Sequence, residues 1–199
     1  MEMAEKGFSY NDFIKQILSV GRISFTIEEV IQQSGYSRKT AQVSLSRLSS
    51  KGDIMLVRRG FYVIITPEFS LQKSVPPLMY IGDLMKYIGR EYYISLLSAA
   101  ALHGAAHQQP MRFFVTTGMP PIRNIENDRL HIAFNVKKEW NTFSVIEKKT
   151  RTGYVKVSTP EATMLDLVEN QRTFGLARIV SIIDELSDSI SKSSLRTTA

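Results

Sequence analysis

The chain of 199 residues contains no cysteine and only three histidines. Without cysteine there can be no disulfide framework, no thiolate zinc site and no cysteine nucleophile. The histidines are His103, His107 and His131, and the first two have the spacing of neighbours on one helix face. No H-E-x-x-H or similar carboxylate pattern surrounds them, so the sequence predicts neither a metal site nor a cofactor.

Long hydrophobic runs are also missing. No stretch reaches the ~18 apolar residues that read as a membrane span, and residues 1–10 lack the apolar core of a signal peptide. We therefore expect a cytoplasmic protein with no membrane partner. Hydrophobic residues still make up 43% of the chain, enough for a packed core in one large domain or two small ones.

Local signals in residues 9–74 predict helices, then a hairpin. Ser9 is a helix N-cap before an apolar stripe, and Thr26 with Glu29 forms a capping box at the start of a short second helix. A third helix is expected from Ser37 to about Lys51. Two short β-prone runs, 54–57 and 61–65, then flank Arg58-Arg59-Gly60. This order is that of a winged helix-turn-helix.

The rest of the chain mixes helical and strand patterns. Prolines in residues 66–77 indicate a linker, and the tail 191–199 is polar, with fraying expected. The sequence predicts an α+β protein, with a winged helix-turn-helix DNA-binding domain at 1–75 and a mixed α/β domain at 76–199. In the second domain helices are expected at 78–88, 92–106, from Thr159, and at 176–190, and strands at 111–117, 130–136, 143–147 and 154–158.

The third helix is the most informative segment. Its helical period places Ala41, Leu45 and Leu48 on the buried side. The other side carries short polar residues between longer hydrogen-bonding ones, a surface that fits a major groove. There Lys and Arg favour guanine, Gln favours adenine and Val can touch a thymine methyl group. The outward residues are Lys39, Gln42, Val43, Ser46 and Ser50, with Arg47 on the flank.

Charge density supports this interpretation better than the formal net charge of +6. Residues 35–59 carry six basic residues against one acid, Asp53. Ser37 would leave the N-terminus of its helix aimed at a phosphate, and a basic hairpin turn can reach the DNA backbone or minor groove. The predicted DNA-binding residues are Ser37, Arg38, Lys39, Gln42, Ser46, Arg47, Lys51, Arg58 and Arg59. The alternative is a solvated helix face beside an ordinary basic hairpin.

No trusted catalytic signature occurs in the second half, and we expect no enzyme. The phosphate-binding P-loop, the nucleophile elbow and the Gly-rich dinucleotide turn are all missing from the sequence. Asp128 followed by Glu147-Lys148-Lys149 loosely resembles a metal-dependent nuclease set. Asn127-Asp128 looks more like a turn, and a packed, hydrogen-bonded role is expected for His103.

A second group of basic residues lies in 137–156, where six Lys and Arg residues face Glu139 and Glu147. Such a group could bind a polyanion or dock an acidic partner. It could equally be a solvated edge, because lysines commonly protect edge strands. The residues of this second basic surface are Lys137, Lys138, Lys148, Lys149 and Arg151, and Lys156 adds a further charge.

Three blocks of sequence resemble a known family. Residues 37–62 resemble the winged-helix half of AbiEi-type antitoxins, and the blocks 92–104 (YYISLLSAAALHG) and 158–168 (STPEATMLDLV) resemble the family's C-terminal domain. The first block is generic to many winged helices. The other two, in this order and spacing, are more specific.

The resemblance implies an antitoxin of a bacterial type IV toxin–antitoxin system for abortive infection. Such a protein binds inverted repeats in its promoter, represses its own operon and counteracts a nucleotidyltransferase-like toxin. The DNA role then falls on Arg38, Lys39, Gln42, Arg47, Arg58 and Arg59, and no catalytic residue is implied.

The resemblance leaves the mode of toxin antagonism open, because it does not say whether toxin and antitoxin touch. A one-component repressor with a ligand-sensing C-terminal domain is the main alternative, and a DNA-targeted nuclease is a weaker one. The neighbouring gene separates the antitoxin from the repressor, because an antitoxin is expected beside a nucleotidyltransferase gene.

Overall fold

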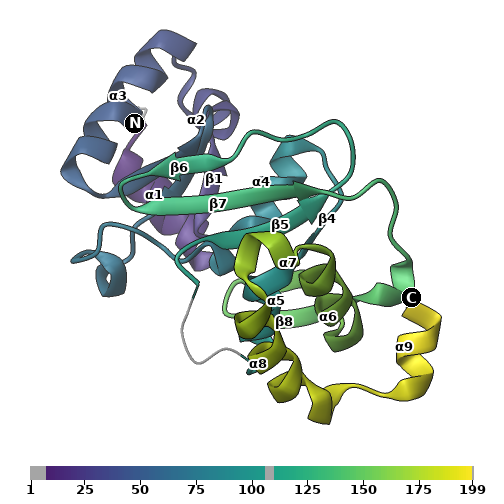
Figure 1. Cartoon of the computed structure of the whole chain (residues 1–199). Helices are drawn as coiled ribbons and strands as arrows, with labels where there is room; N and C mark the ends of the chain where they lie inside the picture. Colours follow the sequence, from purple (N-terminus) through teal and green to yellow (C-terminus); the bar gives the residue numbers. More distant parts are fainter. Residues whose placement is uncertain (1–7, 106–109, 199) are drawn as a thin grey trace, which may run out of the picture. The chain divides into compact units, whose positions relative to one another are not determined.

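The computed structural model describes residues 8–105 and 110–198 (Figure 1). His107 and Ala106, which entered the sequence predictions, lie outside the described residues. Contacts within the chain divide it between Leu84 and Met85 into two compact units, called the first and the second unit below. Within the described ranges, no helix is both long and apolar enough to span a bilayer. The boundary near residue 75 between functional domains stays a prediction.

The first unit is a winged helix-turn-helix, as the sequence predicted. Its elements are α1 (Tyr10–Ser19), β1 (Ser24–Thr26), α2 (Ile27–Ser34), α3 (Arg38–Lys51), β2 (Ile54–Arg58) and β3 (Phe61–Ile64). The strands form an antiparallel sheet in the order β1-β3-β2. Strand β1 was not predicted, because three residues are too few to show an alternating pattern.

Capping side chains fix where these helices begin. Thr26 Oγ1 accepts a hydrogen bond from the Glu29 backbone N–H, and Glu29 Oε2 accepts one from the Thr26 N–H, which completes the predicted capping box. Ser37 Oγ accepts from the Thr40 N–H at 3.2 Å and starts α3. Each such cap is worth about 1 kcal/mol. Gly52 ends α3 in the left-handed conformation, with φ of 86°.

The core of the first unit lies between the three helices and the sheet. Phe25 packs edge-on against Phe13, with ring centroids 5.1 Å apart, and stacks on Tyr62 at 5.6 Å. Ala41 and Leu45 of α3 are fully buried in the same cluster. Burial of this face of α3 leaves its other face for solvent.

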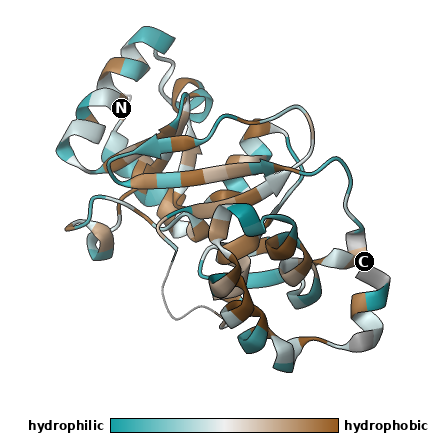
Figure 2. Ribbon diagram, in the orientation of Figure 1, coloured by the Kyte–Doolittle hydropathy of each residue, from teal (hydrophilic) through white to brown (hydrophobic). Residues whose placement is uncertain are grey.

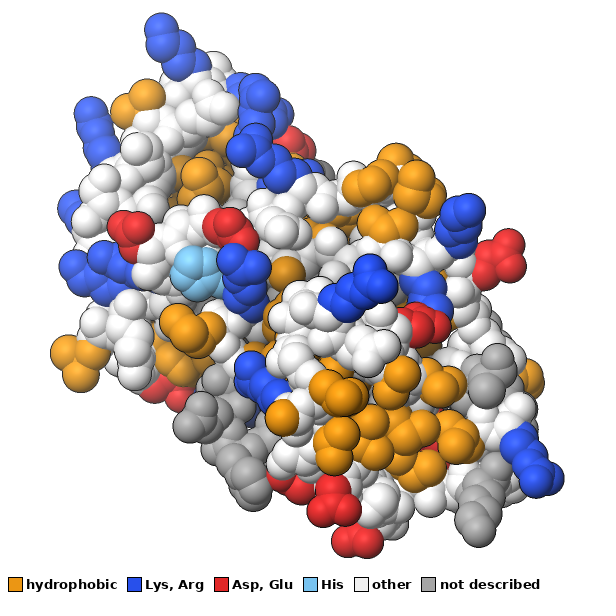
Figure 3. Space-filling view, viewed as in Figure 1, with side chains coloured by type: hydrophobic (Ala, Val, Ile, Leu, Met, Phe, Trp, Pro, Cys, Tyr) orange, Lys and Arg blue, Asp and Glu red, His pale blue; other side chains and the backbone are white. Residues whose placement is uncertain are grey.

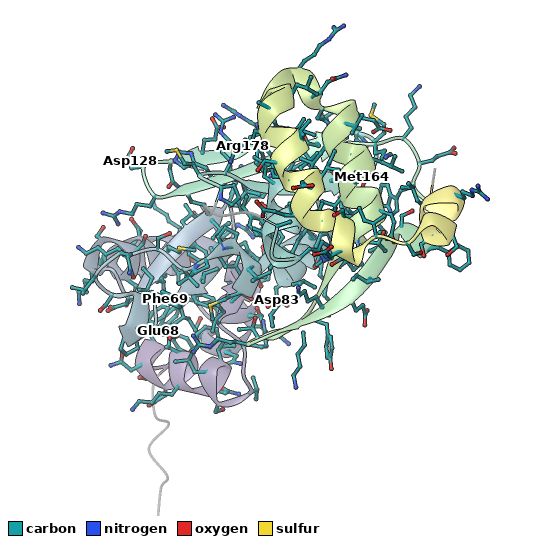
Figure 4. All side chains as sticks on the ribbon, turned by 60° about the horizontal axis from the view of Figure 1, so that its bottom comes forward. Glu68, Phe69, Asp83, Asp128, Met164 and Arg178 are labelled. Carbon is teal, nitrogen blue, oxygen red and sulfur yellow. The ribbon has the colours of Figure 1, made fainter. Side chains whose placement is uncertain are left out.

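Prolines shape the segment that follows β3. Short 3₁₀ turns at Pro67–Phe69 and Pro77–Met79 precede α4 (Ile81–Ile88). The second turn explains why α4 begins three residues later than the predicted helix 78–88. Ser24 Oγ donates a 2.5 Å hydrogen bond to Asp83 Oδ2, so β1 is tied to the first turn of α4. Asp83 is labelled in Figure 4.

The second unit is a mixed sheet with helices. The described strands are β4 (Tyr92–Ile94), β5 (Phe113–Thr117), β6 (Ile125–Asn127), β7 (Leu130–Val136), β8 (Val145–Thr150) and β9 (Gly153–Ser158). They pair in the order β6-β7-β5-β4-β9-β8. The pairs β4–β9 and β5–β7 are parallel and the others antiparallel. Together with the first unit, this confirms the predicted α+β class.

The helices of this unit are α5 (Leu96–Leu102), α6 (Pro160–Glu169), α7 (Gln171–Phe174), α8 (Leu176–Leu186) and α9 (Lys192–Thr198). Apolar side chains of α5, α6, α7 and α8 pack with Phe114 of β5 and Ala133 of β7 in one cluster. Figure 2 shows the hydrophobic colour concentrated in α6 and α8, whereas hydrophilic residues dominate α3.

Three predictions about this unit were wrong. The segment 92–106 is not one helix, because the β-prone triplet Tyr92–Ile94 forms β4 before α5 begins. The last predicted helix ends at Leu186, and a 3₁₀ turn follows at Ser187–Ser189. The tail, expected to be frayed, contains α9. The short strand β6 had no recognisable pattern.

Candidate nucleic-acid interface

Helix α3 presents a polar face to solvent. Ala41 and Leu45 are completely buried, and Leu48 packs against the same core. Figure 3 shows blue Lys and Arg side chains standing out from the part of the first unit where Figure 1 places α3. The structure thus places the predicted base-reading residues on one accessible side of a rigid helix. Those exposed residues are Lys39, Gln42, Val43, Ser46, Arg47 and Ser50.

The hydroxyl of Ser37 is used by the helix itself. It accepts from the Thr40 N–H and also lies 2.9 Å from Thr40 Oγ1. A phosphate at this end of α3 would therefore be held by backbone N–H groups of the first turn rather than by the serine side chain.

Arg38, the first residue of α3, is engaged within the protein. Its Nη1 donates to Glu28 Oε1 of α2 at 3.0 Å. The two side chains are 51% and 53% exposed, so water and salt screen the pair and it is weak. This pairing was not foreseen, because the sequence pattern gave no sign that α2 would place an acid beside this arginine.

The basic turn of the hairpin is held beside the start of α2. Arg58 ends β2, and Arg59 and Gly60 make the turn into β3. The Gly60 carbonyl accepts a 2.9 Å hydrogen bond from the Ile27 N–H, and its φ of 83° favours glycine at this position. Arg59 is exposed and Arg58 half-buried, while Lys51 is exposed in the last turn of α3.

An ion pair also ties Arg22, two residues before β1, to α2. Arg22 Nη1 donates to Glu29 Oε1 at 2.8 Å, and Nη2 donates to the Ser24 carbonyl at 3.1 Å. Burial alone would raise the pKa of Glu29, but hydrogen bonds from Arg22 and Thr26 outweigh it and lower that pKa. The hydrogen bond to Glu29 in turn raises the pKa of Arg22. The network thus joins the start of β1 to the first turn of α2.

Partners within the protein engage three of the lysines counted in the second basic surface. Lys137 Nζ lies 2.7 Å from Asp166 Oδ1 and 3.4 Å from Glu169 Oε2. Lys148 Nζ donates to the Leu102 carbonyl, and Lys156 pairs with Glu91 at 2.5 Å. Lys138, Lys149 and Arg151 are exposed. A polyanion-binding role for this surface stays a prediction.

A buried carboxylate lies at the centre of the second unit. Asp166 of α6 is 4% exposed and accepts a 3.1 Å hydrogen bond from the Tyr93 hydroxyl. Trp140 packs edge-on against the Tyr93 ring at 5.3 Å. Burial raises the pKa of Asp166 even though Lys137 and Tyr93 stabilise its charged form. Burial would lower the pKa of Lys137, but its two acidic partners raise it.

The weaker sequence signals resolve differently. His103 Nε2 lies 2.7 Å from the Ser158 carbonyl, and burial lowers the pKa of His103, in keeping with the packed role expected.

The two acidic residues of the nuclease interpretation do not lie together. Asp128 follows β6 and Glu147 lies on β8, the two opposite edges of the sheet. Five strand spacings separate them by about 24 Å. The residues that the structure describes hold no cluster of metal-ligating side chains.

The two specific blocks of sequence meet in one place. Ile94 of β4 pairs in parallel with Val157 of β9, and Ser158 Oγ donates to the Ile94 carbonyl at 3.3 Å. The Tyr93–Asp166 hydrogen bond joins the same two blocks. They therefore form part of the interior of the second unit. In the sequence, this unit follows the winged helix-turn-helix.

That combination is typical of a DNA-binding regulator with a second domain. Residues 93–199 match the family model described as AbiEi antitoxin C-terminal domain. Residues 24–65 match the one described as transcriptional regulator, AbiEi antitoxin. The chain belongs to the AbiEi antitoxin family.

A solved structure shares the fold. The crystal structure of the RV2827C protein from Mycobacterium tuberculosis is similar with a TM-score of 0.63 and 16% sequence identity, over 94% of this chain and 70% of that one. Identity at this level supports the fold alone. No curated protein matches the chain.

Proposed function

We propose that this antitoxin binds inverted repeats in its own promoter, represses its operon and counteracts a nucleotidyltransferase-like toxin. The observation that carries the DNA part is the accessible polar face of α3 above the buried Ala41 and Leu45. A 14-residue helix with such a face is long enough to lie in a major groove. Family membership supports the antitoxin part.

In this proposal, different basic and polar residues contact different parts of the DNA. Lys39 and Arg47 suit the acceptor atoms of guanine, and Gln42 suits the edge of adenine. Ser46 lies between them on the same face and adds a short hydrogen-bonding group. Arg58, Arg59 and Lys51 hold phosphates in this proposal, and so set affinity more than sequence preference.

The dependence of DNA affinity on salt concentration measures how many Lys and Arg side chains contact phosphates. With Lys39 and Arg47 on bases, the four cations Arg38, Lys51, Arg58 and Arg59 on phosphates give a slope of log K against log salt of about −3.6. If Arg38 keeps its pair with Glu28, three cations remain on phosphates and the slope is about −2.7. A slope near zero would contradict the proposed interface altogether.

The decisive experiment removes the basic residues of α3 and the turn. Arg38→Ala, Lys39→Ala, Arg58→Ala and Arg59→Ala together are expected to abolish the mobility shift of promoter DNA while circular dichroism stays unchanged. Lys15→Ala with Lys86→Ala is the control, because both lysines are exposed and lie on α1 and α4. Unchanged DNA binding by the fourfold variant would refute the assignment of α3.

The same variant separates repression from toxin antagonism. With the second unit folded, it is expected to lose repression and keep most of its protection against the toxin. Loss of both activities would mean that DNA binding is itself the antitoxin mechanism. A co-transcribed nucleotidyltransferase gene is expected, and its absence would favour a repressor that senses a ligand.

A further inference from the structure

Strand β8 forms an open edge of the sheet in the second unit. It pairs with β9 on one side, and among the described strands it has no partner on the other. Its six residues, Val145–Thr150, include neither proline nor glycine and keep one uninterrupted register with β9. Such an edge presents unpaired backbone N–H and C=O groups to which another strand can pair.

The turn of the β8–β9 hairpin determines which backbone groups face the open edge. The turn has two residues, 151–152, so Thr150 and Gly153 close the hairpin as a hydrogen-bonded pair. Hydrogen-bonded and non-hydrogen-bonded pairs alternate along an antiparallel ladder. The backbone groups of Thr150 and of every second residue before it therefore bond to β9, whereas those of Glu147 and Lys149 point toward the open edge.

The same two edge residues carry opposite charges. Glu147 and Lys149 are two positions apart in a strand, so their side chains lie on one face of the sheet. Both are exposed, and neither has an ion-pair partner among the described residues. Lys156, which lies opposite Glu147 on β9, is paired with Glu91 at 2.5 Å. The open edge thus presents an acid and a base that are both available to another chain.

This pair of charges is complementary to itself across a two-fold axis. We propose that a second copy of this chain pairs through β8 in antiparallel orientation, with the axis between the two copies of Lys148. Glu147 then lies opposite the partner's Lys149 in a hydrogen-bonded pair that exchanges both backbone bonds, and the reciprocal pair forms on the other side of the axis. The interface is isologous, as a two-fold axis requires.

The charges favour this register over its neighbours. An axis at Glu147 or at Lys149 would place two like charges directly opposite each other, which is destabilising. An axis at Lys148 brings two lysines together at the centre, but the ammonium group of each is held by the Leu102 carbonyl of its own chain. The axis at Lys148 is therefore the one that forms two attractive pairs on the exposed face.

The size and net charge of the chain set the strength of this pairing. On the face opposite to Glu147, the register places Ile146, which is 42% exposed, against the partner's Thr150, and β-branched residues suit such positions. A six-residue strand is about 20 Å long, so it buries far less than the ~800 Å² per partner of a stable interface. The formal charge of +6 on each copy also opposes association. Pairing is therefore weak and is expected at high protein concentration.

Because the chain has no cysteine, one substitution gives a cross-linking test. Lys148→Cys lies beside its own mate in a non-hydrogen-bonded pair, with Cα atoms about 4.5 Å apart, and is expected to form a disulfide-linked dimer under mild oxidation. Ile146→Cys is the matched control on the same strand and face. Two such residues would be offset by about 13 Å along the strands, too far for a disulfide.

Charge variants in the Lys148→Cys background test the geometry. Glu147→Lys places two lysines opposite each other at both pairs and is expected to reduce cross-linking by about five- to tenfold. Glu147→Lys combined with Lys149→Glu is expected to restore it. Cross-linking of Ile146→Cys as efficient as that of Lys148→Cys would mean a different register and overturn the proposal. So would the absence of a Lys148→Cys dimer in concentrated protein, or its cross-linking only to a co-expressed toxin.

A second measurement uses the chain without cysteine, because Lys148→Cys also removes the hydrogen bond to the Leu102 carbonyl. The parent chain is expected to sediment faster as its concentration rises, and Glu147→Lys is expected to lose this dependence while its circular dichroism stays unchanged. Identical sedimentation of the two proteins would refute the β8 contact. Neither measurement uses DNA, so a failure of promoter binding and a failure of this contact are observed separately.

Discussion

Arg38 of α3 donates a 3.0 Å hydrogen bond from Nη1 to Glu28 Oε1 of α2. The residue best placed to reach a phosphate at the start of α3 is therefore already paired with an acid. An exposed pair of this kind contributes about 0–1 kcal/mol, so DNA can displace it. Glu28 then acts as a competitor for the arginine and adds a negative charge beside the proposed interface.

Glu28→Gln is expected to tighten promoter binding. The substitution releases Arg38 and removes a charge that repels phosphate, which gives about two- to fivefold higher affinity for an exposed pair. The slope of log K against log salt should become steeper by about 0.9, the value for one additional cation on a phosphate. Titrations at several salt concentrations measure both, with Glu139→Gln as the control. Unchanged affinity and slope would place Arg38 outside the interface.

Gly60→Ala is expected to weaken the first unit and the hairpin turn together. A side chain at φ of 83° costs about 1–2 kcal/mol, and the hydrogen bond from the Ile27 N–H to the Gly60 carbonyl would be disturbed. Thermal unfolding should begin several degrees lower. Arg59→Ala, which leaves the backbone alone, should lose DNA affinity without this loss of stability. If Gly60→Ala unfolds at the same temperature as the parent protein, the turn accepts a side chain at this φ without strain, and the prediction is wrong.

The parts of this protein that the sequence predicts are those with local causes. The capping box at Thr26 and Glu29, the span of α3 from Ser37 to about Lys51, and the buried stripe of α3 all follow from residues a few positions apart. The winged helix-turn-helix is therefore predictable from local sequence patterns. The exposed side of α3 follows from the same periodicity.

The rest depends on contacts between distant residues. Tyr93 and Asp166 are 73 positions apart, and no local pattern marks either as a partner of the other. Lys137 was assigned to a basic surface because charge counts ignore pairing, yet it neutralises Asp166. The triplet Tyr92–Ile94 precedes a helical, alanine-rich run, and only pairing with β5 and β9 makes it a strand.

Glu29→Gln tests the capping network through its pH dependence. The folded-state pKa of Glu29 is lowered, so the ionised carboxylate stabilises the fold above its unfolded-state pKa. That contribution is lost as pH falls through the folded pKa. The variant is therefore expected to be less stable by about 1 kcal/mol at neutral pH, with a smaller difference near pH ~3. Urea unfolding at both pH values measures it, and a difference that grows in acid would contradict the network.

Lys137→Met tests the buried carboxylate of the second unit. Without the ammonium group, Asp166 would be ionised in an apolar site with only Tyr93 as a donor. Fully buried pairs lose about 3–5 kcal/mol when one partner is removed. The Lys137 side chain is 35% exposed, so the loss should fall below that range.

The stability deficit of Lys137→Met, like that of Glu29→Gln, is expected to be larger at neutral than at acid pH. The cause differs, because the carboxyl pKa involved is raised here and lowered in Glu29. The folded-state pKa of Asp166 is raised, so the group opposes folding increasingly as pH rises through that pKa. Removing Lys137 raises this pKa further, and the deficit of Lys137→Met should grow from acid to neutral pH. Lys137→Met with Asp166→Leu removes both charges and should recover most of the stability. Urea unfolding across pH separates the cases, because equal deficits at acid and neutral pH would mean that packing, not charge, is what Lys137 contributes.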